Sequence, residues 1–341
     1  MTPPPHIQPS HGEQQIELTH PVEVSPTQVT TADGVALYVE RIRPISGRVV
    51  APVLLLHGLS ANRYAFLLPE RSLAVYLARR GFDVFVADLR GVGHSAHPGW
   101  HWDFHDHLEL DVPALVHHAA ASSGSGAVHA VGHSMGGILL MGYGMIEPRA
   151  PVASTLAIAS SLDYRVGDSI FKTMYRLRPV LERTPIFPVG TLHRGIAPLV
   201  ERIPIPNVRM HVHPSNIEAK VVRNIYTRVM TNVPVSLLRS LATTFEPEGL
   251  RSRDGRIRFV ERASRYPWPL LLFAGSADRQ APPLSVEHTA HLFAQQTVGP
   301  VYFGRAHGHA DDYGHYDIVL GRRAPEEVWP RIVDWLRVQS A

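Results

Sequence analysis

The chain has 341 residues, of which 45% are hydrophobic and 18% are charged, and its formal net charge is +3. This length and composition suit a globular protein with one sizeable core, or one core with an inserted subdomain, and they exclude a disordered chain. The small net charge gives no indication of nucleic-acid binding, so we expect no nucleic-acid partner. Because the chain contains no cysteine, disulfides, thiolate catalysis and cysteine-ligated metals are excluded.

The N-terminal residues 1–22 are polar and rich in Pro, Gln and His, which predicts a flexible leader. They lack the cationic start and the apolar stretch of a secretory signal peptide. No apolar run approaches the roughly 18 residues that a membrane helix needs. We therefore expect a cytoplasmic protein without a transmembrane segment, and the sequence leaves secretion and the oligomeric state open.

Short apolar runs and helical patterns alternate over residues 23–160. Asp33-Gly34 between two strand-like runs predicts a β-hairpin. The runs after the hairpin predict strands at Val53–Leu56, Val84–Ala87, Val128–Val131 and Ala153–Ala159, and helices at Leu73–Arg80, Leu108–Ala121 and Gly136–Tyr143. Buried strands that alternate with helices predict an α/β fold, in which a mostly parallel sheet is covered on both faces.

The alternation stops in residues 161–255, a stretch rich in Pro, Arg, Met and Tyr that has no clear strand. Its latter half, Ser215–Leu241, has helical character. The stretch carries fourteen Lys and Arg against eight Asp and Glu, so its excess charge is +6 and the rest of the chain is net −3. We predict an inserted, mainly helical cap here and call residues 161–255 the insertion.

Strands and helices resume in residues 256–341. The patterns predict strands at Leu270–Phe273 and Pro300–Phe303, and helices at Leu284–Phe293 and Pro325–Val338. Residues 23–160 and 256–341 are therefore predicted to be two parts of one core that the insertion interrupts.

A G-x-S-x-G motif lies at Gly132-His133-Ser134-Met135-Gly136. The motif alone is weak evidence, since a chain of this length contains one by chance about one time in ten. Here it follows a predicted strand and begins a predicted helix, which is the setting of a nucleophile elbow. In that turn, glycines allow a close approach of strand and helix, and the helix N-terminus offers N–H groups to a developing oxyanion. Ser134 is the candidate nucleophile.

A serine hydroxyl needs a base, and in this setting an acid and then a histidine follow the serine along the chain. Asp278 comes just after the predicted strand Leu270–Phe273, at the carboxyl end where ligands meet open α/β sheets. Three histidines lie between the last predicted strand and the last helix: His307, His309 and His315. Their positions alone do not choose among them.

An oxyanion hole needs a second backbone N–H close to the nucleophile. Gly58 permits a close approach of the loop after Val53–Leu56, so the N–H groups of Leu59 and Met135 are the candidate donors. The substrate-pocket candidates are neighbours of these motifs and residues of the insertion, namely His57, His133, Leu162, Phe171 and Tyr175. The aromatic residues among them would equally fit a core within the insertion.

Five motifs occur in the order found in α/β-hydrolases. They are His57-Gly58, DLRGVGHS at 88–95, GHSMGG at 132–137, GSAD at 275–278 and YGHYDIVLG at 313–321. The C-terminal run that begins with GHYDIVLG resembles the ends of acid-lipase-like hydrolases and of polyhydroxyalkanoate synthase-like proteins. In both, the His of such a motif is catalytic, which implies that His315 is the base.

This resemblance covers about residues 28–160 and 256–341 and does not extend to the insertion. The synthases use a cysteine nucleophile, so Ser134 favours hydrolysis over polymerisation. The dehalogenase and epoxide-hydrolase branches have an aspartate at the elbow, so the serine also argues against these reactions.

Two His- and Asp-rich stretches resemble metal-ligand clusters. One contains His101, Asp103, His105, Asp106 and His107, and the other contains His307, His309, Asp311 and Asp312. We interpret the first as a solvated loop at the pocket entrance and expect no metal in either.

Together these features predict hydrolysis of a small-molecule carboxylic ester with an apolar acyl group. Ser134, His315 and Asp278 would act as a triad through a covalent acyl-enzyme, with no metal or organic cofactor. Acyl transfer, amide cleavage or carbon–carbon bond hydrolysis by the same triad remains an alternative. A non-catalytic ligand-binding protein on this scaffold is a second alternative, because a fold alone establishes no function.

Overall fold

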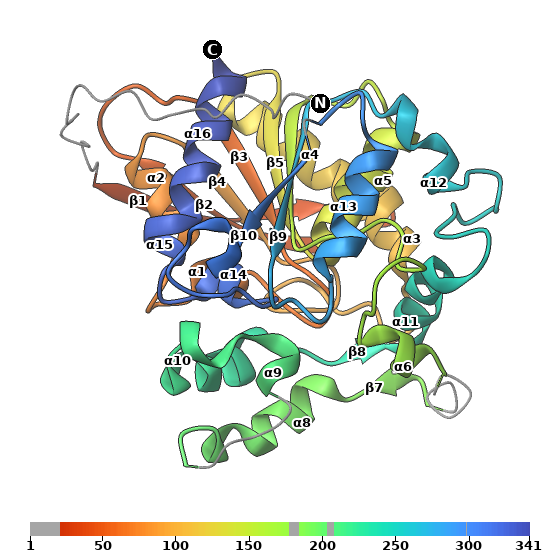
Figure 1. The fold of residues 1–341 in the computed structure, drawn as a ribbon. Helices are drawn as coiled ribbons and strands as arrows, with labels where there is room; N and C mark the ends of the chain where they lie inside the picture. The colour runs from red at the N-terminus through yellow and green to blue at the C-terminus, as the bar shows by residue number, and fades with distance from the viewer. Residues whose placement is uncertain (1–20, 177–183, 203–207, 298) are drawn as a thin grey trace, which may run out of the picture.

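The computed structural model describes residues 21–176, 184–202, 208–297 and 299–341. Within them, eight strands form one sheet in the order β1-β2-β4-β3-β5-β6-β9-β10 (Figure 1). Their bounds are β1 (Val22–Thr30), β2 (Ala36–Pro44), β3 (Pro52–Leu56), β4 (Asp83–Ala87), β5 (Val128–His133), β6 (Val152–Ile158), β9 (Leu270–Gly275) and β10 (Pro300–Phe303). β2 runs antiparallel to both β1 and β4, whereas all other neighbours are parallel. The predicted α/β fold is confirmed.

Helices outside the insertion pack against both faces of the sheet (Figure 1). Their bounds are α1 (Tyr64–Leu67), α2 (Leu73–Arg79), α3 (Phe104–Asp106), α4 (Val112–Ser123), α5 (Met135–Ile146), α12 (Phe259–Arg262), α13 (Pro283–Leu292), α14 (Asp317–Leu320), α15 (Ala324–Glu327) and α16 (Trp329–Ser340). Every residue of β3, β4, β5 and β9 is buried. Strands covered on both faces favour continuous apolar runs, which is the pattern of PVLLL in β3 and LLLFAG in β9.

The insertion contributes no strand to the eight-stranded sheet in the part of it that the structure describes. Its helices are α6 (Phe171–Arg176), α8 (Val189–Ile196), α9 (Val208–His211), α10 (Ala219–Asn224) and α11 (Val235–Ala242), and its short strands are β7 (Ile186–Phe187) and β8 (Val233–Pro234). Figure 1 shows α8, α9 and α10 as a separate layer below the sheet. The insertion contacts the loops at the carboxyl ends of the strands, where Thr231 N donates to Ser60 O at 2.8 Å.

Three details differ from the sequence predictions. The pair β7–β8 is a strand pair where no strand was expected. The helical run Ser215–Leu241 is divided between α10 and α11, because Pro234 has no N–H to continue a helix and favours an extended residue before it. The closing helix is divided at Val328, two residues before Pro330, which lies in the first turn of α16.

The flexible leader predicted for residues 1–22 lies outside the described residues up to residue 20, and Val22 already belongs to β1. Among the residues that the structure describes, none of the helices is both long and apolar enough to cross a membrane. The predicted bounds of the insertion, 161–255, stay a prediction.

Candidate active site

Ser134 lies in the turn between β5 and α5 with a φ of 56°, a value that residues other than glycine rarely adopt. Hydrogen bonds to its own backbone hold this turn. Ser134 N donates to Ile158 O at 2.8 Å, and Ser160 Oγ donates to Ser134 O at 2.8 Å. Strain of this kind persists only where the surroundings fix the chain, and here it places the hydroxyl-bearing residue at the carboxyl end of the central strand β5.

The glycines on either side of Ser134 have no room for a side chain. A Cβ on Gly132 would overlap the backbone of Gly137, and one on Gly136 would overlap the carbonyl of Leu56. The close approach of strand and helix that the motif predicts is therefore present.

Asp278 and His315 meet at the same end of the sheet. His315 Nδ1 donates to Asp278 Oδ2 at 2.8 Å, and both side chains are buried. Asp278 Oδ1 accepts from the backbone N–H groups of Gln280 (2.7 Å) and Ala281 (2.9 Å), which fixes the carboxylate. With the proton on Nδ1, Nε2 of His315 keeps a lone pair, as a base requires.

No hydrogen bond joins Ser134 Oγ to His315 within the described parts of the chain. Catalytic hydrogen bonds of this kind are often long before substrate binds and shorten in the complex. The other two candidate bases lie elsewhere: His307 is exposed and stacks on Tyr302, and His309 contacts the backbone of Gly304. Of the three histidines, His315 is the one that the structure pairs with Asp278.

His133 supports the loop that carries His315. Its Nε2 donates to the carbonyl oxygen of His315 at 2.8 Å, and the two rings lie 4.7 Å apart. Burial, followed by the nearby His315 ring, lowers the pKa of His133 to about 3. His133 is therefore neutral at physiological pH, and it acts on the site by holding backbone.

The loop after β3 lies directly against Ser134. A Cβ on Gly58 would be 2.8 Å from Ser134 Cβ and 3.3 Å from its Oγ. Leu59 and Met135 both line the cavity at the nucleophile. The N–H of Met135, at the first position of α5, has no helical carbonyl to bind. This placement is compatible with the predicted pair of oxyanion-hole donors.

His57 supports the loop after β3, which carries Leu59. Its Nε2 accepts the backbone N–H of Leu89 (3.1 Å), so the proton is on Nδ1, which donates to Gly58 O (3.0 Å). Burial lowers the pKa of His57 to about 4, which keeps the ring neutral. The adjacent buried ion pair of Arg63 with Asp88, 2.6 Å between Nη1 and Oδ2, ties the same loop to the DLRGVGHS motif.

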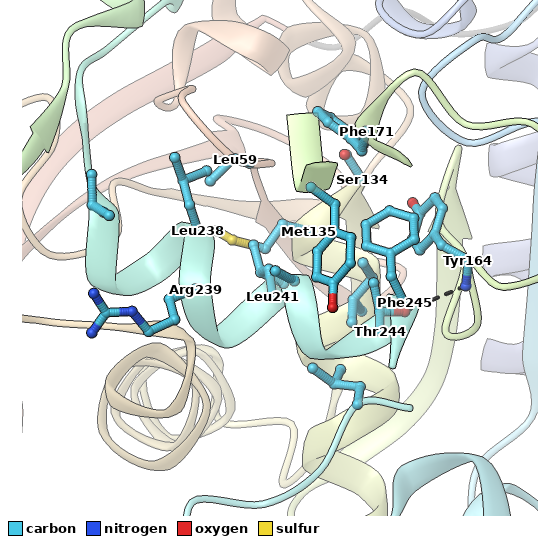
Figure 2. Close-up of a pocket in the computed structure, with 15 residues that line it drawn as sticks. Leu59, Ser134, Met135, Tyr164, Phe171, Leu238, Arg239, Leu241, Thr244 and Phe245 are labelled. Carbon is cyan, nitrogen blue, oxygen red and sulfur yellow. Dashed lines mark hydrogen bonds between the residues drawn. The ribbon is translucent and has the colours of Figure 1, made fainter. Parts of the chain in front are cut away.

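An apolar cavity opens on Ser134 and encloses about 890 Å³ of space, part of it open to solvent. Figure 2 shows α11 and the turn after it along one side of the cavity. The lining residues are Leu59, Ser134, Met135, Ile138, Tyr164, Phe171, Tyr175, Val235, Leu238, Arg239, Leu241, Ala242, Thr244, Phe245 and Leu250. Most are aliphatic or aromatic, and Figure 2 shows the guanidinium of Arg239 directed away from the other side chains.

The structure places the predicted pocket residues in two settings. Phe171 and Tyr175 line the cavity, whereas His57, His133 and Leu162 do not. The two histidines are turned to backbone groups behind the site, and Leu162 is fully buried.

Sequence reasoning missed the contribution of α11 and of the turn after it to the cavity, represented by Leu238 and Leu241 in the helix and Phe245 in the turn. The available signal was the amphipathic pattern of residues 235–242, which predicts a covered face without saying what covers it.

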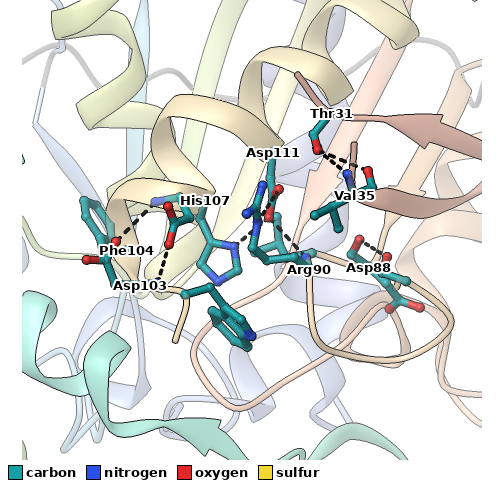
Figure 3. Close-up of polar contacts among 12 residues, drawn as sticks. Thr31, Val35, Asp88, Arg90, Asp103, Phe104, His107 and Asp111 are labelled. Atoms are coloured by element: carbon teal, nitrogen blue, oxygen red, sulfur yellow. Dashed lines mark hydrogen bonds and ion pairs between the residues drawn. The ribbon is translucent and has the colours of Figure 1, made fainter. Parts of the chain in front are cut away.

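The interpretation of residues 101–107 as a solvated loop is wrong for two of its histidines. His107 is buried and lies 2.7 Å from Asp111 Oδ2 through Nδ1, and Asp111 also accepts from Arg90 Nε at 2.8 Å (Figure 3). His105 Nε2 lies 2.9 Å from Arg251 O. These histidines have protein partners because the chain folds the loop back onto the core. Within the described residues, no group of three or more His, Cys, Asp or Glu is arranged to hold a metal.

Asp317, two residues after His315, was not predicted. It is fully buried and accepts from the backbone N–H groups of Gly314 (3.0 Å) and His213 (2.9 Å). Burial raises the pKa of Asp317 to about 7, against the opposing effect of these N–H donors.

The fold and the elbow define the class of protein. The chain belongs to the α/β-hydrolase fold family, whose match covers residues 51–321. It is 24% identical to triacylglycerol lipase 1 of Arabidopsis thaliana over 95% of this chain and 90% of that protein. Lipase 3 of Drosophila melanogaster is 36% identical, over 32% of each chain. Some lipases match over shorter parts, such as 40% of triacylglycerol lipase 2 of Arabidopsis thaliana.

Solved structures share the fold at low identity. An esterase from Thermogutta terrifontis has a TM-score of 0.61 and 19% identity, covering 93% of this chain and 100% of that one. The monoacylglycerol lipase of Paleococcus ferrophilus has a TM-score of 0.58 and 18% identity, covering 93% and 99%.

Proposed function

We propose that this protein hydrolyses carboxylic esters, with Ser134 as nucleophile, His315 as base and Asp278 as the residue that orients the base. The observation that carries the proposal is a serine in a strained elbow that faces an apolar cavity, at the sheet end where His315 and Asp278 are hydrogen-bonded. The lipases and esterases among the similar proteins support the same class of reaction.

In the proposed first half-reaction, His315 Nε2 takes the proton of Ser134 Oγ as the oxygen attacks the ester carbonyl. The N–H groups of Leu59 and Met135 donate to the oxyanion, and each such donor contributes roughly 2.7–4 kcal/mol to transition-state stabilisation. Protonated His315, held by Asp278, then donates its proton to the leaving alcohol. Water repeats these steps on the acyl-enzyme and releases the acid.

The cavity supports an apolar acyl group. Its wall beside Ser134 is formed by side chains such as Leu238, Leu241 and Phe245. An alkyl chain that packs against this wall is removed from water, which favours binding. Each buried methylene contributes about 0.8 kcal/mol. The insertion supplies this wall and would therefore set the preferred chain length.

The test is a panel of nitrophenyl esters of increasing acyl length, together with a fluorophosphonate label, on the wild type, Ser134→Ala and His315→Ala. We expect the label to attach only where Ser134 is present. We also expect Ser134→Ala to lower kcat by about 10⁴-fold or more, as loss of a triad nucleophile does.

His307→Ala and His309→Ala are the matched controls and should retain wild-type turnover. Labelling of Ser134→Ala, or undiminished turnover by it, would refute the proposal. Activity that survives His315→Ala but not a control variant would move the base to that histidine.

A further inference from the structure

A segment of the insertion lies against the loop that carries Asp278. We call Met210–Asn216 the bridging segment. The side-chain amide of Gln280 donates to Met210 O at 3.0 Å and lies 3.2 Å from His211 Nδ1. The backbone N–H of the same Gln280 donates to Asp278 Oδ1 at 2.7 Å. One residue therefore connects the acid of the proposed triad with the insertion.

The bridging segment also contacts the loop that carries His315. Asp317 Oδ1 accepts from His213 N at 2.9 Å, and Asp317 Oδ2 accepts from Asn216 Nδ2 at 3.3 Å. The same carboxylate accepts from Gly314 N at 3.0 Å, on the other side of His315. Asp317 thus closes a small ring of backbone around His315 and fastens it to the insertion.

The bridging segment packs tightly against the loop that carries His315. A Cβ on Gly314 would be 2.7 Å from His213 N and 2.8 Å from Asp317 Oδ1. Asn216 continues the contact through its backbone and side chain, because Asn216 O accepts from Arg322 N at 2.6 Å and Asn216 Oδ1 lies 3.2 Å from Arg323 N. Asn216 and Asp317 are fully buried, and neither lines the cavity, so neither touches substrate.

We propose that Asn216 and Asp317 are positioning residues that hold His315 in register with Asp278, so that the bridging segment belongs to the catalytic apparatus. Proton transfer depends steeply on geometry, and a displacement of about 1 Å can cost 100-fold in rate. This inference rests on the proposed function, because it takes His315 as the base.

The test exchanges the two polar groups. Asn216→Asp places a carboxylate against Asp317, and Asp317→Asn places an amide against Asn216, so each single variant loses the donor–acceptor match. The double variant Asn216→Asp with Asp317→Asn restores it in the opposite direction. We expect each single variant to lower kcat by roughly 10- to 100-fold with little change in KM, and the double variant to regain most of the loss.

Asn224→Asp is the matched control. Asn224 also lies in the insertion, at the end of α10, and donates to a carboxylate of the core, Glu70 Oε1 at 2.7 Å, but it lies outside the bridging segment. We expect its kcat to equal that of the wild type. Rates are counted per fluorophosphonate-reactive site, so that unfolded protein does not enter kcat, and Asn216→Ala replaces Asn216→Asp if the latter does not fold.

Wild-type kcat in Asn216→Asp, or in the replacement Asn216→Ala, overturns the inference, and so does a double variant no faster than the single ones. A rise in KM with unchanged kcat also overturns it, since that pattern indicates a role in substrate binding. These outcomes are distinct from failure of the proposed function, which is decided by Ser134→Ala.

Discussion

Ser134 has a positive φ, which residues other than glycine rarely adopt. Gly132 and Gly136 make this turn possible because they let α5 begin close to β3 and β5. The motif around Ser134 can be recognised in the sequence because this turn accepts so few residue types. His133 and His57 show the opposite case. Each is adjacent to a functional backbone group, but the structure turns its ring to a carbonyl behind the site, and nothing in the local sequence decides that direction.

The role of Asp278 is testable by a single isosteric change. In Asp278→Asn, the amide can donate to Nδ1 of His315, which then holds its proton on Nε2 and cannot accept one from Ser134. We expect kcat to fall by about 10³- to 10⁴-fold with an unchanged fold. Ester turnover and circular dichroism measure the two effects.

Asp312→Asn is the control for this change. Asp312 lies close to the same loop, accepting from Ser276 Oγ at 2.7 Å, but it has no contact with His315. A similar loss in both variants would mean that the loop, rather than the orientation of His315, was disturbed.

At the scale of the elements, α11 determines the shape of the proposed acyl site. It lines the cavity with Val235, Leu238, Leu241 and Ala242 (Figure 2). Its helical period is visible in the sequence, but the face that covers Ser134 is chosen by packing against the core. Pro234, the last residue of β8 and the N-cap of α11, separates α11 from α10.

We expect Leu238→Trp to shorten the acyl preference. The larger ring would fill space beside Ser134, so kcat/KM for octanoyl esters should fall by about tenfold, a loss of about 1.4 kcal/mol. Acetyl esters should be hydrolysed as by the wild type. The same substitution at Leu192, which is exposed on α8, is the control. An equal effect on all chain lengths would show that α11 does not form the acyl wall.

At the scale of the whole molecule, several buried histidines make the fold sensitive to acid. Burial lowers the pKa values of His57 and His129 to about 4 and that of His133 to about 3. Between these values and about 6.5, the unfolded chain binds protons that the folded chain does not. Their contribution to stability is therefore complete above pH 6.5 and is lost as the pH falls toward 4.

We expect the Tm to decrease steadily between pH 6.5 and pH 4 for this reason. Each histidine that is protonated in the unfolded chain and neutral in the folded chain changes the free energy of unfolding by about 1.4 kcal/mol per pH unit. His129→Gln is the informative variant, because His129 lies near the start of β5, at the opposite end of the strand from Ser134, and the ring contacts the hydroxyls of Ser154 and Ser340. Its free energy of unfolding should depend less steeply on pH, and an unchanged slope would contradict the assignment.

The sequence by itself determined the class of fold, the elbow at Ser134 and the position of Asp278 after its strand. These features depend on local patterns: buried runs in β3, β5 and β9, and glycines at a turn that accepts nothing larger. A resemblance, more than spacing, selected His315 from its neighbours. Only the tertiary structure decided which histidine meets Asp278, which face of α11 covers the nucleophile, and that Asn216 reaches Asp317. Those contacts join residues far apart in the chain, and the energy that selects them comes from packing that exists only once the insertion lies on the core.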